Sequence, residues 1–509
     1  MLSRVKTVCF SGINVISVDV EVHFAKGQPG ITIVGLGDKA VKESIDRIRA
    51  TLSTLGLILP PQRITINLAP ADILKEGTHY DLPIILGILE TMGIIPHNAV
   101  DNYIALGEVG LDGCLRSVNG VLPASLYANT KGLGIVCPSS NGKEASWGGK
   151  DMDIVSANDI TQLIKHFKGI QKLQRPQISK DNFITKSTKD MADVKGQHVA
   201  KYAMIVAASG GHNILLVGSP GTGKTMLAER ITTILPPLST KEMIDVSMIH
   251  SVSGLIKDGN LSSIRPFRAP HHTTSQYALI GGGSKAKPGE ITLAHNGVLF
   301  LDELPEYQRD TLEALRQPME SGIVSITRVN NKVVYPANFQ LVSAMNPCKC
   351  GFYGSKTKVC KCSQKSIMQY QSKISGPLLD RIDICVRMED VNPKFINIDD
   401  NNLKEETSDE IKAKVIKARS IQTERYKNEN FNLNSRIPDG KLLHKYCMPE
   451  NKDDIKVLDE IVEKLGISMR GTTKILRVAR TIADLENCEK VNKDHILRAA
   501  VFRQQIFGS

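Results

Sequence analysis

The residues with the clearest chemistry form a glycine-rich segment that ends in a lysine and a threonine. It reads Gly218-Ser219-Pro220-Gly221-Thr222-Gly223-Lys224-Thr225 and fills every fixed position of the pattern G-x-x-x-x-G-K-[ST]. In this pattern, backbone N–H groups surround phosphate oxygens, the lysine reaches the terminal phosphates and the threonine hydroxyl is a ligand of Mg²⁺. The segment predicts a site for ATP and Mg²⁺ in which all eight residues contact the nucleotide and Lys224 is catalytic.

Two apolar runs are expected to hold this loop and a pair of carboxylates at one edge of a sheet. Residues 213–217 precede the loop, and residues 226–231 after it have a helical pattern. Residues 297–301 form the second run, which ends in Asp302 and Glu303. Such runs are typical of buried parallel strands that present side chains at their carboxyl ends. We expect Asp302 to bind Mg²⁺ through water and Glu303 to polarise the attacking water.

The composition is that of a soluble protein with several domains. Of its residues, 41% are hydrophobic and 23% are charged. The chain has 509 residues, and this length exceeds what one hydrophobic core ordinarily contains. Its formal net charge of +11 is compatible with a polyanionic partner. The sequence shows neither a run of 18 apolar residues nor a signal peptide, so we expect a cytoplasmic protein that does not contact membranes.

Four of the ten cysteines lie within fifteen residues, at Cys348, Cys350, Cys360 and Cys362. In a reducing compartment, four thiolates on one short loop are typical ligands of a tetrahedral Zn²⁺. The C-x-C spacing is tighter than the usual C-x₂-C, and a redox-active or unliganded cluster is the alternative. The other six cysteines are scattered and are expected to be mostly small core residues.

Two basic segments are candidates for contact with the phosphates of DNA. Lys285 and Lys287 lie in a glycine-rich loop between the phosphate-binding segment 218–225, called the P-loop below, and the second apolar run. Arg328 and Lys332 belong to a hairpin pattern with an Asn-Asn turn. Such side chains bind phosphates without reading bases, but solvated lysines are equally compatible with the pattern.

The first 165 residues have the pattern of an α+β domain. Alternating segments at 19–24 and 63–68 predict strands, and residues 39–52 and 82–92 predict helices. Residues 30–40 resemble a dinucleotide-binding turn, G-x-G-x-x-A. In a dinucleotide-binding domain, a carboxylate that binds the ribose follows this turn by about 20 residues, and the sequence has none there. We therefore interpret the segment as a tight turn between a strand and a helix rather than as a dinucleotide site.

Two further stretches in this region, residues 71–83 and 106–118, resemble the Lon-protease-like domain, which has a ribosomal S5-like fold. Proteolytic members of that superfamily use a serine from the first stretch and a lysine from the second. His79 and Val118 stand near those positions, so a Ser–Lys mechanism lacks both partners. The resemblance implies a non-proteolytic platform for assembly or substrate binding, and structural roles are expected for His79, Asp81 and Glu108.

The order of motifs after the P-loop resembles that of AAA+ ATPases. The resemblance implies that Asn346, at the end of an apolar run, is the sensor 1 residue that orients water or the γ-phosphate. It also implies that Arg381 is an arginine finger that reaches the nucleotide of the neighbouring subunit. A planar, permanently charged guanidinium suits this contact with phosphate oxygens. Arg470 is the expected sensor 2 contact to the γ-phosphate, and Val194 and Gly196 are expected beside adenine. The alternative for Arg381 is a salt bridge with a neighbouring aspartate, 380 or 383.

Three stretches extend this resemblance to almost the whole chain. They are RAPHHTTS at 268–275, a segment from GGG to LAH at 281–295 and a segment from LPE to ESG at 304–322. On these stretches the chain resembles the ComM/YifB family of magnesium-chelatase-like AAA+ ATPases. The family implies a homo-hexameric ring that moves single-stranded and branched DNA during natural transformation. A chelatase-type subunit that remodels a protein partner is the alternative, and a Lon-like protease is disfavoured. His271 and His272 are expected in core or loop roles.

The expected architecture is therefore a multidomain α/β protein. It comprises a Lon-protease-like platform (1–165), a polar linker (166–190), an AAA+ core (191–395) with the cysteine insertion (348–362) and an all-helical lid (396–509). Helical periodicity in the lid is present at 409–426, 452–465, 472–483 and 493–505.

Overall fold

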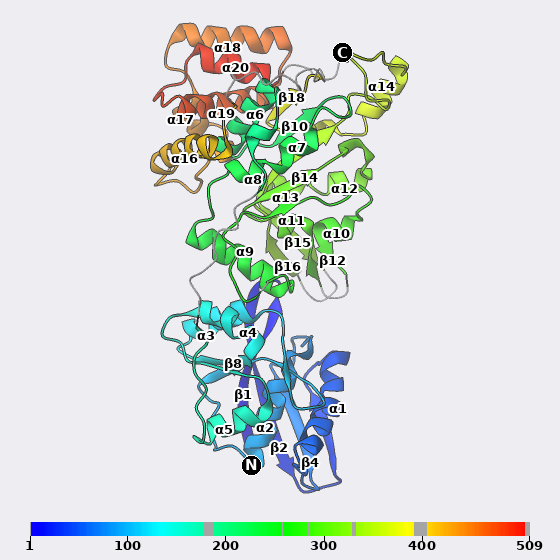
Figure 1. Ribbon diagram of the computed structural model, residues 1–509, viewed down its shortest axis with the longest axis vertical. Coiled ribbons are helices and arrows are strands. Elements are labelled where there is room, and N and C mark those ends of the chain that lie inside the picture. Colours follow the sequence, from blue (N-terminus) through cyan, green and yellow to red (C-terminus); the bar gives the residue numbers. More distant parts are fainter. Residues whose placement is uncertain are drawn as a thin grey trace.

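The computed structural model describes residues 2–177, 188–256, 258–283, 286–327, 332–390 and 405–503. Within these ranges the molecule is elongated, with an N-terminal sheet at one end and a group of C-terminal helices at the other (Figure 1). A parallel sheet lies between them. The structure is thus a mixed α/β fold with several parts and a helical C-terminal region, as expected. None of the described helices is long and apolar enough to cross a membrane.

The N-terminal sheet has seven strands in the order β3-β4-β2-β1-β5-β8-β9. Their bounds are β1 Leu2–Ser11, β2 Asn14–Ala25, β3 Gly30–Val34, β4 Arg63–Ala69, β5 Tyr103–Ala105, β8 Gly134–Pro138 and β9 Ile154–Ala157. β1, β2 and β4 pair antiparallel, whereas β5, β8 and β9 run parallel to β1 and to one another. The parallel half was not expected from alternation, because β8 is buried at every position and carries no period of two.

The helices of this part cover the sheet and start where the sequence provides caps. α1 (Lys39–Thr54) begins at Asp38, whose carboxylate accepts a hydrogen bond from Val41 N at 2.9 Å. Gly35 in the turn before it has φ of +105°, and a Cβ there would lie 2.3 Å from Leu68 O. The glycines at 30–40 therefore serve a tight turn from strand to helix, as preferred from the sequence. The remaining elements are α2 Asp81–Thr91, β6 Glu108–Val109, β7 Leu115–Arg116, α3 Val121–Thr130, α4 Ser139–Ala145 and α5 Ile160–Phe167.

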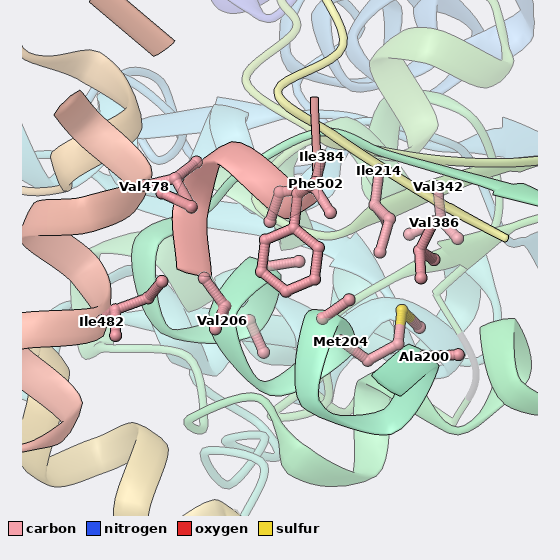
Figure 2. Packing of buried hydrophobic residues seen from close by; sticks show 14 of the residues in the cluster. Ala200, Met204, Val206, Ile214, Val342, Ile384, Val386, Val478, Ile482 and Phe502 are labelled. Atoms are coloured by element: carbon pink, nitrogen blue, oxygen red, sulfur yellow. The ribbon is translucent and has the colours of Figure 1, made fainter. Parts of the chain in front are cut away.

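The central sheet has five parallel strands in the order β11-β14-β17-β10-β18. They are β10 Ile214–Val217, β11 Phe267–Arg268, β14 Val298–Leu301, β17 Gln340–Met345 and β18 Ile384–Arg387. β10 is buried on both faces: Ile214 and Leu216 join one apolar cluster, and Leu215 and Val217 join another. The first cluster contains α6 (His198–Gly210), the strands and the C-terminal helices, which pack together in Figure 2.

Shorter elements surround this sheet. They are α7 Lys224–Glu229, α8 Ile231–Ile234, α9 Thr240–Val252, α10 Gln276–Ile280, β12 Gly281–Gly282, β13 Lys287–Pro288, α11 Glu290–Leu293, α12 Arg309–Glu313, α13 Arg316–Ser321, β15 Ile323–Thr327, β16 Lys332–Pro336, α14 Gln364–Gln371 and α15 Gly376–Leu379.

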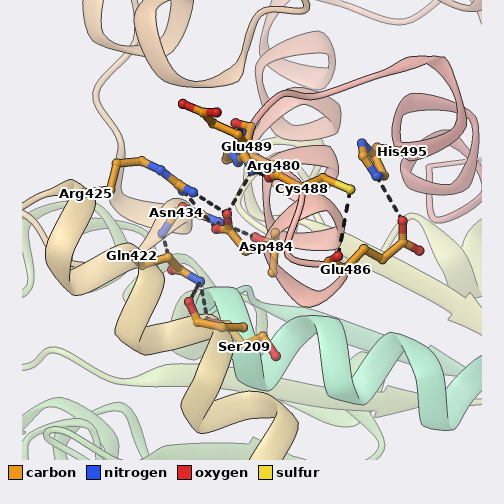
Figure 3. Close-up of polar contacts among 12 residues, drawn as sticks. Ser209, Gln422, Arg425, Asn434, Arg480, Asp484, Glu486, Cys488, Glu489 and His495 are labelled. Atoms are coloured by element: carbon orange, nitrogen blue, oxygen red, sulfur yellow. Dashed lines mark hydrogen bonds and ion pairs between the residues drawn. The ribbon is translucent and has the colours of Figure 1, made fainter.

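The C-terminal helices are α16 Ser408–Arg425, α17 Lys441–Cys447, α18 Lys452–Leu465, α19 Met469–Leu485 and α20 Lys493–Val501. A buried carboxylate in α19, Asp484, joins α16 and the segment before α17 to α19: it accepts hydrogen bonds from Arg425 Nη1 at 3.0 Å, Arg480 Nη2 at 2.9 Å and Asn434 Nδ2 at 2.8 Å (Figure 3). Gln422 Nε2 donates to Ser209 O at 3.1 Å and so ties α16 to α6. The helical region is fixed on the central sheet rather than linked loosely to it.

Several contacts join the N-terminal part to the central part, among them one beside α9 and one at the β15–β16 hairpin. Near α9, Gly120 N donates to Ser251 O at 3.2 Å, and Ser251 Oγ donates to Glu144 Oε1 at 2.5 Å. Burial raises the pKa of Glu144. At the second contact, the turn between β1 and β2 reaches the β15–β16 hairpin, where a Cβ on Gly12 would lie 2.9 Å from Val333 Cγ1 (Figure 1).

Candidate nucleotide site and cysteine cluster

The P-loop lies between β10 and α7, at the carboxyl edge of the parallel sheet. Gly221 and Gly223 have φ of +82° and +86°, a region that side chains with a Cβ rarely adopt. α7 begins at Lys224, directly after this turn. The local structure is the strand, glycine-rich turn and helix that the pattern predicts, and it directs backbone N–H groups toward one point.

Lys224 is held at the mouth of this loop by three oxygens. Its Nζ donates to Gly218 O at 2.7 Å, Ser219 O at 2.9 Å and Asn346 Oδ1 at 3.1 Å. Burial lowers the pKa of Lys224, whereas Asp302 and Glu303 act in the opposite direction. Lys224 and Asn346 are therefore brought together, as the AAA+ resemblance implied.

Thr225 and Asp302 also meet, although 77 residues separate them. Thr225 Oγ1 donates to Asp302 Oδ2 at 2.7 Å, and Asp302 Oδ1 accepts from Glu303 N at 2.9 Å. A hydroxyl and a carboxylate at this separation suit a Mg²⁺ ion that takes the hydroxyl directly and the carboxylate directly or through water. Glu303 is exposed and has φ of +51°, so its side chain leaves the strand end and faces solvent.

Glu303 has a partner that the sequence did not predict. His272 Nδ1 lies 3.5 Å from Glu303 Oε2, and the centroids of the His271 and His272 rings lie 4.0 Å apart with the planes tilted by 35°. The contact arises because β11 pairs with β14, so the residues after both strands lie side by side. The sequence expectation of a core or loop role for His272 is incomplete, since strand adjacency is not readable from spacing.

Arg381 and Arg470 lie at the opposite edge of the same sheet. β10 and β18 pair from Ile214↔Ile384 to Val217↔Arg387, so Arg381 precedes the strands whereas the P-loop follows them. Four strand residues at about 3.3 Å each separate the two edges. Neither arginine lies beside Lys224 of its own chain.

The arginines border a cavity of about 400 Å³ that also contains Asp383 and Lys474. Arg381 pairs with Glu320 and donates to Pro377 O at 2.6 Å, and Arg470 Nη1 lies 3.9 Å from Asp380 Oδ2. The salt bridge considered as the alternative role of Arg381 is thus formed, but with Glu320 rather than with Asp380 or Asp383.

Asp383 anchors this edge to α19. Lys474 Nζ lies 3.3 Å from Asp383 Oδ1 and donates to Ile382 O at 3.0 Å. Burial raises the pKa of Asp383, but Lys474 and His212 outweigh it and hold that pKa below its usual range. Arg470 lies one turn before Lys474, so this ion pair positions the helix that carries it.

The four clustered cysteines converge. The Sγ atoms of Cys348, Cys350 and Cys360 are separated by 3.4, 3.7 and 3.6 Å, and all four Sγ atoms lie within 4.8 Å of one another. Zn–S bonds of 2.3 Å in a tetrahedron place sulfurs about 3.8 Å apart. Backbone N–H groups of Phe352 and Lys361 lower the pKa of Cys350, whereas the neighbouring sulfurs help raise the pKa of Cys360 and of Cys362, as expected for thiols that share one site without a cation. The donor set fits one tetrahedral metal ion despite the tight C-x-C spacing.

The two basic segments adjoin each other. Lys287 in β13 and Lys332 in β16 are exposed, and Tyr335 Oη donates to Ala286 O at 2.8 Å between the segments. Lys285 and Arg328 lie outside the described residues.

The candidate residues of the N-terminal part have structural partners. His79 Nε2 donates to Val8 O at 2.9 Å, and burial lowers the pKa of His79. Asp81 pairs with Arg47 at 2.7 Å, and Glu108 accepts a hydrogen bond from Thr78 Oγ1 at 2.5 Å. The partners of His79, Asp81 and Glu108 agree with the structural roles expected for these residues.

Val194 and Gly196, the residues expected beside adenine, lie before α6. Val194 is buried in the cluster of Figure 2, and Gly196 N donates to Glu405 Oε1 at 3.3 Å.

His272→Ala is expected to lower kcat for ATP about tenfold, because Glu303 loses the group that orients it. Nucleotide affinity should change little, since His272 contacts Glu303 and not the P-loop. The measurement is steady-state turnover together with the Kd of a slowly hydrolysed ATP analogue, with His271→Ala as the matched control. Equal kcat values for the two variants would contradict this role.

Comparison with known proteins places these motifs in a family. Models described as "Magnesium chelatase, subunit ChlI", "Subunit ChlI of Mg-chelatase" and "Magnesium chelatase, subunit ChlI C-terminal" match residues 190–396, 20–141 and 405–503. The competence protein ComM of Haemophilus influenzae is 41% identical over 500 residues, which cover 97% of this chain and 96% of ComM. The uncharacterized protein YifB of Salmonella typhimurium is 39% identical over 502 residues, 99% of this chain and 97% of YifB. The magnesium-chelatase 67 kDa subunit of Heliobacterium mobile is 27% identical over 233 residues, 40% of this chain and 34% of that subunit. The chain belongs to the ComM/YifB family of magnesium-chelatase-like AAA+ proteins.

Proposed function

We propose that the protein is an ATP-driven motor that assembles as a homo-hexameric ring and moves branched DNA. The observation that carries the proposal is the placement of the P-loop and Arg381 at opposite edges of one sheet. A nucleotide bound by Lys224 lacks both arginines of its own chain. Arg381 and Arg470 complete the site if each subunit presents that edge to the P-loop of the next, which is a head-to-tail contact that closes into a ring.

In this arrangement each residue has a defined part in hydrolysis. The P-loop N–H groups and Lys224 bind the phosphates, and Thr225 and Asp302 would hold Mg²⁺, which would supply positive charge beside the phosphoryl oxygens. Glu303 polarises the attacking water, and Asn346 orients it. Arg381 of the adjacent subunit leaves Glu320 for the γ-phosphate, where its charge stabilises the transition state.

The contacts that support a DNA-moving function are at the basic segments. Lys287 and Lys332 flank a small apolar cluster of Ala286, Val333 and Tyr335, so the two hairpins pack against each other and form one unit. Both lysines are exposed and suit contact with a phosphate backbone. The N-terminal part touches this unit through Gly12. We assign that part as a non-proteolytic, Lon-protease-like platform that couples to the hairpins.

The comparisons favour this function over a chelatase-type subunit. ComM, whose name denotes a competence protein, aligns with 97% of this chain at 41% identity, whereas two chelatase subunits align with 40% and 60% of it at 27% and 22% identity. The first relationship supports the proposal of a role in handling DNA during natural transformation. The chelatase alternative predicts turnover that responds to a protein partner and not to DNA.

We also assign Zn²⁺ to the four cysteines, as one ion per chain.

Shared sites predict complementation between two inactive variants. Lys224→Ala lacks a working P-loop but keeps Arg381, and Arg381→Ala has the converse defect; each alone should lose about 10³-fold in turnover. In an equimolar mixture about a quarter of the interfaces pair an intact P-loop with an intact arginine, and turnover should recover in proportion. The measurement is ATPase activity after co-assembly, with ring size measured in parallel. A mixture no more active than its components would contradict shared sites.

The DNA-facing unit is tested by the double variant Lys287→Ala, Lys332→Ala. Stimulation of turnover by single-stranded and forked DNA should fall, and the slope of log affinity against log salt should decrease by about one per lost phosphate contact. Lys168→Ala is the control, since Lys168 is exposed just beyond α5 in the N-terminal part. Turnover that is independent of DNA in the unmodified protein, together with an absence of branch migration, would overturn the motor.

A further inference from the structure

The loop that carries the cysteine cluster, residues 348–362, lies against the P-loop. Gly351 has φ of +87°, and a Cβ placed on it would lie 2.5 Å from Pro220 Cδ and 2.7 Å from Pro220 Cγ. These separations are shorter than van der Waals contact, so only glycine allows the two loops to approach so closely. The contact joins the residue directly after Cys350 to Pro220 in the phosphate-binding turn.

A carboxylate reinforces the contact. Asp390 Oδ2 accepts hydrogen bonds from Ser355 Oγ at 2.5 Å and Thr357 Oγ1 at 3.1 Å. The Ser219 side chain is close enough to Asp390 to help lower the pKa of that carboxyl, after the larger effect of Ser355. The carbonyl oxygen of Ser219 in turn accepts a hydrogen bond from Lys224 Nζ at 2.9 Å. A chain of direct contacts therefore runs from the cysteine loop to the lysine that binds phosphate.

The cysteine loop has no regular secondary structure of its own. Every residue from 346 to 363 is described, and none of them belongs to a helix or strand. Cys348 is fully buried, whereas all four lysines of the loop are exposed, at positions 349, 356, 358 and 361. A segment of this kind depends on a cross-link or a bound ion to keep one conformation.

We propose that a metal ion held by the four cysteines clamps the P-loop, so that metal occupancy sets the affinity for ATP. The inference rests on the proposed nucleotide and zinc sites and adds an energetic coupling between them. With the ion bound, Gly351 is fixed against Pro220, and Asp390 bridges Ser219 and Ser355. Without the metal ion, the contacts between the cysteine loop and the P-loop weaken, and the P-loop loses its support on one side.

The test is the Kd of a slowly hydrolysed ATP analogue, measured on the full-length protein at fixed Mg²⁺. Three preparations are compared: zinc-loaded protein, protein stripped by a chelator that is then removed, and stripped protein reloaded with Zn²⁺. Coupling between sites is typically 5- to 150-fold, so we expect Kd to rise about tenfold on stripping and to return on reloading. A Kd that stays within about twofold in all three preparations overturns the proposal.

Coupling must be reciprocal, which gives a second readout that does not depend on variants. The ATP analogue should slow the release of Zn²⁺ to a colorimetric chelator from the unmodified protein. Asp390→Ala, which removes the bridge and leaves every cysteine in place, should bind one Zn²⁺ yet lose this protection. Lys358→Ala is the control in the same loop and should keep it. Release at the same rate with and without the analogue overturns the proposal.

These outcomes are separable from the motor itself. Loss of DNA stimulation with intact zinc–nucleotide coupling refutes the motor and leaves the clamp. A protein that binds no metal, or whose nucleotide affinity ignores the metal, refutes the clamp and leaves the motor untouched.

Discussion

The hydrogen bond between Thr225 and Asp302 is the contact on which the rest of the site depends. It joins two chain segments 77 residues apart at the ends of β10 and β14. The segments meet because all five strands are parallel, so their carboxyl ends share one edge. Asn346 reaches the same edge from β17, between those two strands. The buried apolar runs therefore do more than form a core: they fix the relative positions of Lys224, Asp302 and Asn346.

The same parallel arrangement places the arginines where they cannot serve their own nucleotide. Arg381 precedes β18, and the pair of Lys474 and Asp383 holds α19, with Arg470, against that edge. Removing one partner of a buried ion pair generally costs about 3–5 kcal/mol, so this edge is firmly defined. One rigid sheet thus carries a binding half-site on one edge and an activating half-site on the other. In the proposed ring, this geometry would link the nucleotide sites of neighbouring subunits without any internal conformational pathway.

Local patterns in the sequence were sufficient to predict those features that depend on a short motif or on a single strand or helix. The P-loop, Asp302 with Glu303, Asn346 and the converging cysteines were predicted because each depends on a short motif or a buried strand. Helix bounds differ mainly at the ends: α19 begins at Met469 rather than 472, since Ser468 caps it through Gly471 N.

Contacts between distant segments were not predictable in this way. His272 with Glu303, Arg381 with Glu320 and Asp390 with Ser219 each depend on which strands or loops become neighbours. The parallel half of the N-terminal sheet was missed for a related reason, because β8 is buried on both faces and has no alternation. Residue spacing records the period of one element and carries no information on its neighbours.

The central claim is that one chain holds only half of each catalytic site. The most direct measurement is ATP turnover per chain as a function of protein concentration, with assembly state determined on the same samples by light scattering. Turnover per chain should be very low where the protein is monomeric and should rise steeply with ring formation, to a plateau. Constant turnover per chain across the transition from monomer to ring would show that a single chain completes its own site and would contradict the account.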